Sequence, residues 1–257
     1  MILRLVTLNV LCDDTHSQRI QTPTRHRAIW STLGTLTPHV IGLQEVSQQA
    51  LGDLMTHPWA KAHTCSDTPH SKDLHPHGQV LLTTHPVTSS WSCRFGPHKR
   101  AVAFDLQLPH RVGALTVCVL HLTSSRKQPQ YDRRAAQLSQ LLGRLPARAV
   151  IMGDFNFDHS REANTLLDAG FTDLWPHLHP GDPGFTFDPT QNGLAALMSQ
   201  TTRPKRYDRV FVRGKGLRPH KARLILNTPL PHPAGLLGPL FASDHFGICA
   251  EIEVTAP

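Results

Sequence analysis

Residues 151–158, IMGDFNFD, place Asp154 and Asn156 directly after an apolar run that is typical of a buried strand. On an extended segment, side chains two residues apart point to the same side, so Asp154 can orient water while Asn156 donates to a phosphate oxygen. The structural alternative is an Asx turn that caps the helix after it. Because Ile151 and Met152 indicate burial, an ionised Asp154 would need a metal ion or an imidazole as its partner.

Polar side chains also stand at the ends of other strand-like runs. Asn9 follows RLVTL, Glu45 lies in LQEV, His121 follows TVCVL, Asp208 precedes RVFV, and Asp244 and His245 precede FGICAEI. Runs that end in polar groups in this way predict one convergent site. Hydrolysis of a phosphate ester needs such a site, because it requires an activated water, positive charge near the phosphate oxygens and help for the leaving oxygen.

Several of these residue types have defined chemical uses. Glu45 offers the hard oxygen that Mg²⁺ binds while it retains water ligands, although a solvated carboxylate at a strand end would look the same. Asp208 is able to fix the tautomer of His245. His121 offers a donor where a strand ends, or is a structural histidine with satisfied hydrogen bonds. Other histidines, at 57, 63, 70, 75 and 77, match no zinc-ligand spacing and have no cysteine pair beside them.

The composition favours a polyanionic partner and a single large domain. The chain has 257 residues, and 26 Lys and Arg against 19 Asp and Glu give a net charge of +7. Basic residues form short clusters, at Lys99–Arg100, Arg133–Arg134 and 203–209, which favours a nucleic-acid groove over a charged arm. We therefore expect one catalytic domain over residues 1–257, monomeric, with nucleic acid as its partner.

Cysteine usage and the first residues bear on the compartment. The five cysteines are odd in number and include no CxxC pair, which favours a reduced, cytoplasmic setting. The opening MILRLVTLNV has neither the pattern of a signal peptide nor the length of a membrane span. The last predicted strand ends close to Pro257, which also fits a domain taken from a larger multidomain chain.

The spacing of apolar residues predicts more strands than helices. Strands are predicted at 3–8, 40–43, 79–83, 101–108, 114–120, 149–152, 209–213, 222–226 and 246–254. Helices are predicted at 25–36, 131–145 and 161–169, and long irregular loops at 57–77 and 174–206. This mixture indicates an α/β or α+β sandwich, in which two sheets pack face to face and helices cover the outside.

Six motifs together resemble the endonuclease/exonuclease/phosphatase superfamily, in the order that the family has and over residues 3–254. They are NV at Asn9, LQEV at Glu45, HLTSS at His121, GDFN at Asp154, YDRVFVR at Asp208 and SDHFG at Asp244. The run HGQVLLTTHPV also resembles an internal strand of the family. The resemblance implies a four-layer α/β sandwich, with two packed mixed β-sheets flanked by helices, and a phosphoesterase that depends on Mg²⁺ or Mn²⁺.

The family's roles carry over to eight positions. The resemblance implies metal binding for Glu45, Asn9 and Asp244, water alignment or deprotonation for Asp154, phosphate binding for Asn156 and His121, and transition-state stabilisation for His245, oriented by Asp208. Substrate contacts are expected from four further residues. These are Arg126 in HLTSSR, Thr186 and Phe187 in the segment GFTFDPTQNGLAAL, and Tyr207. That segment could instead be an irregular packed loop.

Two branches of the superfamily compete. HLTSSR, RRAAQL and YDRVFVR resemble the tyrosyl-DNA phosphodiesterases, whereas NVLCDD at 9–14 is similar to the deadenylases and RNA cyclic phosphatases. Asp158 stands where the tyrosyl-DNA enzymes usually carry an arginine, and an acid there disfavours a DNA strand end. The sequence thus favours RNA ends, by removal of a terminal or 2′,3′-cyclic phosphate or by 3′-end nuclease action. A 5′-tyrosyl-DNA phosphodiesterase is the direct alternative.

Two further readings belong to other classes. The TFDPTQN segment also resembles bacterial sphingomyelinases, but no apolar hairpin or amphipathic basic helix for docking on a membrane is evident. A noncatalytic nucleic-acid-binding module would keep the fold and lose the chemistry. The intact set of Glu45, Asp154, Asn156, Asp208 and His245 argues against that reading.

Overall fold

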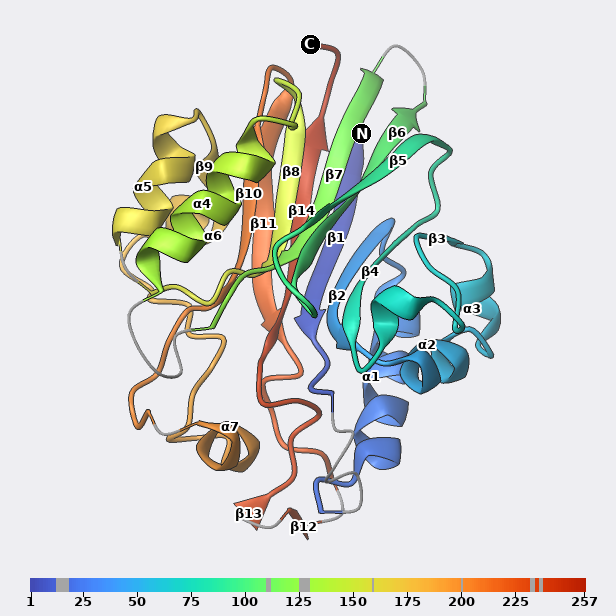
Figure 1. Ribbon diagram of the computed structural model, residues 1–257, viewed down its shortest axis with the longest axis vertical. Coiled ribbons are helices and arrows are strands. Elements are labelled where there is room, and N and C mark those ends of the chain that lie inside the picture. The colour runs from blue at the N-terminus through green and yellow to red at the C-terminus, as the bar shows by residue number, and fades with distance from the viewer. Residues whose placement is uncertain are drawn as a thin grey trace.

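The computed structural model describes residues 1–12, 19–109, 112–124, 130–158, 160–199, 201–231, 234–235 and 238–257. Its centre consists of two six-stranded sheets (Figure 1). The first sheet has the order β11-β14-β1-β2-β4-β3, with β1 at Ile2–Asn9, β2 at Val40–Val46, β3 at Thr64–Cys65, β4 at Gly78–Thr83, β11 at Leu217–Ile225 and β14 at Gly247–Val254. In this sheet β1 and β2 are parallel and the other pairs are antiparallel.

The second sheet repeats this mixed pattern. Its order is β5-β6-β7-β8-β10-β9, with β5 at Val87–Arg94, β6 at Arg100–Leu108, β7 at Gly113–His121, β8 at Ala149–Asp154, β9 at Thr172–Asp173 and β10 at Asp208–Arg213. Here β7 and β8 are the parallel pair. Two short strands, β12 at Ala234–Gly235 and β13 at Gly238–Pro239, form a separate hairpin far from both chain ends (Figure 1).

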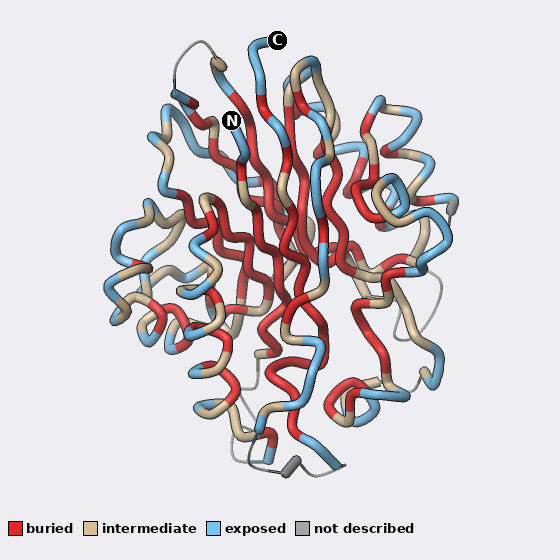
Figure 2. The backbone as a smooth tube through the Cα atoms, turned by 180° about the vertical axis from the view of Figure 1, so that it is seen from behind, coloured by how far each residue is buried: buried red, intermediate tan, exposed pale blue. Residues whose placement is uncertain are grey.

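Strand alternation divides the apolar residues into layers. Leu5, Val119 and Met152 lie in the core between the two sheets, whereas the next residues in the chain, such as Val6 and Leu120, lie in the outer cores. Figure 2 shows this buried centre crossed by the strands, with exposed segments at its edges. The two sheets therefore pack face to face, and each turns its other face to helices.

The helices complete four layers. The first sheet is covered by α1 at Thr22–Leu36 and α2 at Gln48–Leu54, and the second by α4 at Tyr131–Leu142 and α5 at Ser160–Asp168. Short helices follow at α3 (Pro58–Lys61), η1 (Lys72–Leu74), α6 (Leu174–Leu178) and α7 (Gly193–Met198). The four-layer α/β sandwich expected from the sequence is confirmed. In the part of the chain that the structure describes, no helix is long and apolar enough to cross a membrane.

Each of the nine strands predicted from the sequence is present, but the structure also contains strands that were not predicted. β5 was missed because it is an edge strand with mostly exposed, polar side chains and therefore lacks a clean apolar alternation. The predicted helix 131–145 ends at Leu142, directly before Gly143. The long loops predicted at 57–77 and 174–206 are wrong in part, because they contain short elements. Side-chain caps start three of these elements, from Ser71, Asp173 and Asn192.

Gly153 is required by the approach of β8 to β7. Its φ is +140°, and a Cβ at this position would lie 2.1 Å from the carbonyl oxygen of Leu120. We expect Gly153→Ala to lower the free energy of unfolding by about 3 kcal/mol or more. Gly52→Ala, within α2, is the matched control, because a Cβ there meets only Pro69 at 3.9 Å. Chemical denaturation of both variants tests this, and equal stabilities would contradict it.

Candidate active site

The site lies where the core between the sheets ends. Along four strands, the positions that face this core are apolar and then become polar at the same end of the sandwich. These series are Leu5, Thr7 and Asn9 in β1, Val117, Val119 and His121 in β7, Val150, Met152 and Asp154 in β8, and Val212, Val210 and Asp208 in β10. The alternation that builds the core therefore also aims the polar groups into one space, at the end opposite to the chain termini (Figure 1).

Asp154 is the centre of this space. Strand pairing places it beside His121 in β7 and Asp208 in β10. One carboxylate oxygen, Oδ2, accepts a hydrogen bond of 3.1 Å from Nδ2 of Asn9 in the other sheet and lies 3.1 Å from Nε2 of His121. Nε2 of His245 lies 3.9 Å from the same oxygen. Residues far apart in the sequence thus meet at a single oxygen atom.

The charge state of Asp154 follows from these neighbours. Burial alone would raise its pKa, but the charge and hydrogen bond of His121, with the charges of His245 and Lys99, hold the pKa well below the ordinary aspartate value. Asp154 is consequently an ionised carboxylate at neutral pH. A buried, ionised carboxylate needs a positively charged or hydrogen-bonding partner, and the imidazoles of His121 and His245 provide it.

The backbone conformation at Asn156 differs from the expected extended one. Its φ is +53°, so the chain leaves the strand at Asp154 and is not extended across the pair. The backbone N–H of Asn156 donates to Oδ1 of Asp154 at 2.9 Å, which is an Asx turn, and its side-chain amide donates to the carbonyl of Leu122 at 3.1 Å. The extended geometry predicted for Asp154 and Asn156 is wrong, although the turn keeps the two side chains adjacent.

His245 is held by Asp208. Nδ1 of the imidazole and Oδ2 of the carboxylate are 2.7 Å apart, and both side chains are buried. Burial would lower the pKa of His245, but the Asp208 and Asp244 carboxylates raise it well above the ordinary value. The ring of Phe187 packs edge-on against the imidazole at 5.1 Å between centroids. A fixed, positively charged imidazole therefore stands near Asp154.

The substrate contacts expected from Thr186 and Phe187 stay a prediction, and both side chains have contacts within the protein. Thr186 is fully buried, and its hydroxyl accepts hydrogen bonds from the backbone N–H groups of Tyr207 and Asp208 at 3.1 and 3.0 Å. Phe187 is 4% exposed, and its ring packs against His245. Tyr207 is half-buried and keeps a surface for a substrate. The fourth expected contact, Arg126, lies outside the described residues.

This arrangement makes the Thr186 hydroxyl a positioning group for Asp208. Thr186→Val keeps the shape but leaves two buried N–H groups without an acceptor, so we expect a loss of about 2–4 kcal/mol in the free energy of unfolding and reduced turnover. Thr190→Val is the matched control in the same segment, because Thr190 is exposed and its hydroxyl bonds only Asp188. Denaturation and kinetic assays test this. Equal effects of the two substitutions would contradict it.

Glu45 and Asp244 are the acidic candidates for metal binding. Glu45 has a φ of +59° at a register shift between β2 and β4, which turns it out of the strand's alternation, and its Oε2 accepts the N–H of Cys12 at 3.2 Å. Burial raises the pKa of Asp244 to about 6, and the nearby Glu45 carboxylate adds to this increase. The Glu45 and Asp244 carboxylates thus repel each other, and a cation would relieve the repulsion.

The set of oxygen donors fits Mg²⁺ or Mn²⁺. Among the described residues, no group of three or more His, Cys, Asp or Glu side chains could hold a metal ion. Mg²⁺ commonly takes one or two protein carboxylates and keeps several water ligands, so Glu45 and Asp244 with the Asn9 amide are a sufficient set. Sequence reasoning expected these three residues, and the structure brings them to the same end of the sheets.

Three residues that sequence reasoning missed hold the site together. Arg25 is fully buried and donates to the carbonyls of Val10 and Ala242 at 3.2 and 3.0 Å, which joins the loop after Asn9 to the loop before Asp244. Asn192 donates to the carbonyl of Ser243 at 2.8 Å, and the Ser243 hydroxyl donates to the carbonyl of Asn9 at 2.6 Å. No local pattern marks such residues, because their partners are carbonyls distant in the sequence.

Lys99 is a further residue absent from the expected site. The sequence counted it only as part of a basic pair with Arg100. In the structure its Nζ contacts Nε2 of His121, and its charge lowers the pKa of Glu45 and of Asp154 against the effect of their burial. The rings of His77 and His98 lie beside it, with centroids 5.3 Å apart. Lys99 therefore brings a positive charge to the side of the site where Glu45 lies.

Asp158 is neutralised by a partner from a distant segment. Nζ of Lys205 lies 2.7 Å from Oδ2 of Asp158, and both side chains are partly exposed. Together the pair carries no net charge. The acid on which the argument against a DNA end rests is therefore paired with a lysine.

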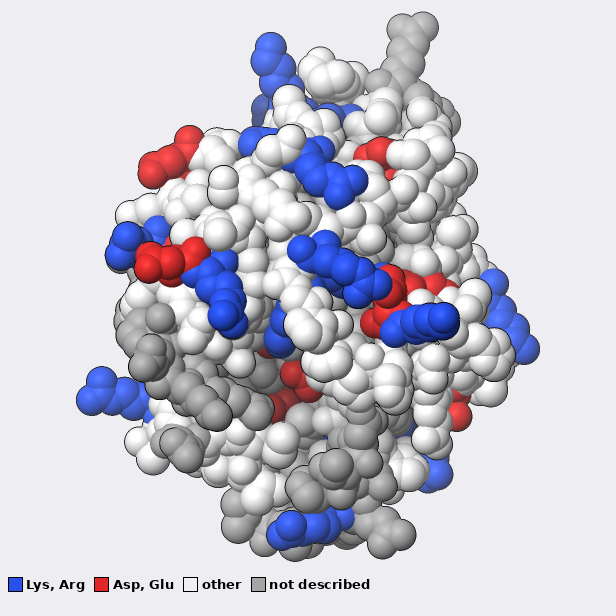
Figure 3. Space-filling model, viewed as in Figure 1, with Lys and Arg blue, Asp and Glu red and all other residues white. Residues whose placement is uncertain are grey.

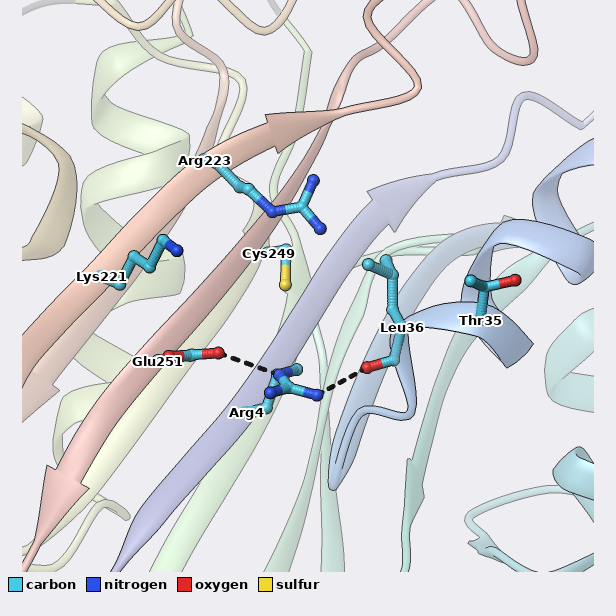
Figure 4. A pocket seen from close by; sticks show the side chains of 7 residues that line it. All are labelled: Arg4, Thr35, Leu36, Lys221, Arg223, Cys249 and Glu251. Atoms are coloured by element: carbon cyan, nitrogen blue, oxygen red, sulfur yellow. Dashed lines mark hydrogen bonds and ion pairs between the residues drawn. The ribbon is translucent and has the colours of Figure 1, made fainter.

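The surface around the site is hollowed. Figure 3 shows a hollow on the face seen in Figure 1, with Asp and Glu atoms visible at its floor and Lys and Arg side chains above it. A separate pocket of about 270 Å³ lies on the outer face of the first sheet and is lined by Arg4, Thr35, Leu36, Lys221, Arg223, Cys249 and Glu251 (Figure 4). There Arg4 bonds Glu251 at 3.0 Å and the carbonyl of Leu36 at 2.9 Å. None of the site residues lines this pocket.

Comparisons with known proteins agree with the fold. The structure of Danio rerio TDP2 complexed with a single-strand DNA product has a TM-score of 0.79 at 21% identity, over 98% of this chain and 99% of that one. Truncated Caenorhabditis elegans TDP2 gives 0.75 at 18% identity, over 98% of each chain. The human Nocturnin catalytic domain with bound sulfate gives 0.72 at 17% identity, over 99% and 94%. No curated protein matches the sequence.

The match of the sequence to a family model covers all residues of the candidate site. The model of the endonuclease/exonuclease/phosphatase family matches residues 6–245, a span that begins in β1 and ends at His245. It includes every residue that converges on Asp154. The chain therefore belongs to the endonuclease/exonuclease/phosphatase family, whose members are generally hydrolases of phosphoester bonds.

Proposed function

We propose that the chain hydrolyses phosphate esters at the ends of nucleic-acid strands, with Mg²⁺ or Mn²⁺ as its cofactor. The observation that carries this proposal is the convergence of Asn9, His121 and His245 on one oxygen of Asp154, beside two acidic residues that suit a divalent cation. We also retain the expectations of a monomeric, cytoplasmic enzyme that folds as one domain over residues 1–257.

Asp154 aligns the attacking water. A carboxylate whose pKa is held well below its usual value is a weak base, so its main task is to orient the water, and it accepts the proton only as the new bond to phosphorus forms. Asn9 and His121 fix the carboxylate, and the Asx turn fixes Asn156 behind it. Both oxygens of the Asp154 carboxylate are therefore held by neighbouring groups.

His245 and the metal site share the stabilisation of charge. The imidazole, kept protonated by Asp208, is available to a phosphate oxygen near Asp154. Glu45 and Asp244, with the Asn9 amide oxygen, would hold the cation, which when bound offsets negative charge on the phosphate. Tyr207 is suited to contact the substrate as a neutral phenol, since burial and the Asp154 and Asp158 carboxylates raise its pKa to about 12.

RNA and DNA ends are the two candidate substrates. The NVLCDD opening favours RNA ends, although its last two residues lie outside the described ranges. The pairing of Asp158 with Lys205 removes the charge argument against DNA, and a similar structure holds a single-strand DNA product. These two observations favour a DNA strand end, with a 5′-tyrosyl-DNA adduct as the first substrate to test.

A substrate panel tests the proposal. Purified protein with Mg²⁺ would be incubated with RNAs that end in a 3′-phosphate, a 2′,3′-cyclic phosphate or a hydroxyl, and with 5′-tyrosyl-DNA. We expect turnover of at least one member and none after chelation of the metal. Binding of the strands with no change in any of them would instead assign the chain to the noncatalytic class. Vesicles of sphingomyelin complete the panel, and hydrolysis there would move the substrate class to lipids.

A further inference from the structure

Lys99 enters the active site from a rigid position. It directly precedes β6, and its carbonyl accepts the N–H groups of Phe95 at 2.8 Å and Gly96 at 3.1 Å, which closes the turn between β5 and β6. The side chain is half-buried and its Nζ contacts Nε2 of His121. A long, flexible side chain is thus held at a defined end of the site by the backbone that carries it.

The charge of Lys99 acts on both parts of the site. Burial alone raises the pKa of Glu45 and of Asp154, whereas the charges of His121 and Lys99 lower both. Glu45 belongs to the expected metal site and Asp154 aligns the water. The contact with His121 also brings the Lys99 ammonium close to Asp154, because Nε2 of that ring lies 3.1 Å from Oδ2 of the carboxylate.

The expected phosphate-binding groups His121 and Asn156 each have a partner within the protein. Nε2 of His121 lies 3.1 Å from Asp154 and also contacts Lys99, and one ring nitrogen can donate to the carboxylate or accept from the ammonium but not both. Asn156 gives an amide N–H to the carbonyl of Leu122. Lys99 places a positive charge beside this same ring nitrogen of His121.

We propose that Lys99 binds a non-bridging oxygen of the substrate phosphate, as a catalytic residue in addition to His121, Asn156 and His245; this inference rests on the proposed phosphoesterase function. The ligand is a phosphate monoester or diester anion. As water adds to phosphorus, negative charge grows on the non-bridging oxygens, and an ammonium fixed in a partly buried site stabilises it without reorganisation. No proton leaves Lys99 in this role.

Three variants and two probes test this role. Lys99→Met removes the charge and keeps the length, Lys99→Arg keeps the charge, and Lys61→Met on exposed α3 is the matched control. Turnover would be measured with thymidine 5′-(4-nitrophenyl phosphate), and binding of inorganic phosphate by calorimetry. We expect Lys99→Met to lower kcat about 100-fold and to weaken phosphate binding about tenfold or more. Lys99→Arg should restore most of both.

Equal phosphate affinity in the wild type and Lys99→Met would overturn the assignment, even if turnover fell, because Lys99 would then act only on the tautomer of His121. Unchanged phosphate affinity with tighter activation by Mg²⁺ would overturn it too, by placing the lysine charge in the metal site. Failure of the proposed function looks different. The wild type would then hydrolyse no substrate in the panel, while calorimetry would still compare phosphate binding in the two proteins.

Discussion

Replacing Asp154 with alanine is expected to lower turnover about 10³- to 10⁴-fold, which corresponds to roughly 4–5.5 kcal/mol of transition-state stabilisation. The carboxylate is the one group that Asn9, His121 and His245 all approach, so no neighbour can take its place. Its loss also releases the Asx turn that carries Asn156. The effect should fall on kcat, because the lost interaction is with the attacking water and not with the ground-state substrate.

Substrate binding by the Asp154→Ala protein should survive. Removing a negative charge from a site that binds an anion does not weaken the electrostatic attraction, so we expect the Kd for a phosphate-ended strand to stay the same or to decrease. Fluorescence anisotropy measures this, with Asp168→Ala at the exposed end of α5 as the matched control. Wild-type turnover in Asp154→Ala would refute the assigned mechanism, and lost binding would indicate an unfolded site.

The parts of the site that could be predicted from the sequence follow strand ends. Asp154 and His121 each close an apolar run, and alternation along a strand tells which side they face. Since each run also contributes to the core between the sheets, its last inward position has to open into the same space. The alternation of apolar residues along each strand therefore predicted where these side chains lie, and the order of the six motifs predicted the family.

Other parts depend on contacts that no local pattern encodes. Lys99 reads as a basic surface residue, and only the turn between β5 and β6 brings it to His121. Arg25 reads as the first turn of an amphipathic helix, but it is buried and bonds carbonyls from both ends of the chain. The charge of Asp158 was interpreted without Lys205, which is 47 residues away. In each case the decisive partner is remote in the sequence.

Glu45 and Asn156 show a second limit. Both have positive φ values, of 59° and 53°, at the point where a strand ends. The sequence analysis expected an extended chain from Asp154 to Asn156 and described no special backbone conformation at Glu45. Such conformations occur for few residues other than glycine, and they persist where surrounding contacts hold them, here the bonds of Glu45 to Cys12 and of Asn156 to Leu122.

The second large effect is expected for Asp208→Asn. The substitution keeps the size of the side chain but removes the charge that lies 2.7 Å from Nδ1 of His245 and helps to keep the imidazole protonated. A neutral imidazole stabilises developing negative charge less, so we expect kcat to fall about 10²- to 10³-fold, or roughly 2.7–4 kcal/mol. Asp132→Asn, at an exposed position in α4, is the matched control.

A double-mutant cycle separates this role from a general structural one. If Asp208 acts only through His245, then Asp208→Asn should lower kcat no further in a His245→Ala background, because the group that it orients is already absent. If Asp208→Asn lowers kcat by the same factor in the wild type and in His245→Ala, then the Asp208 carboxylate does not act through the imidazole. Its role would then be to stabilise the structure of the second sheet.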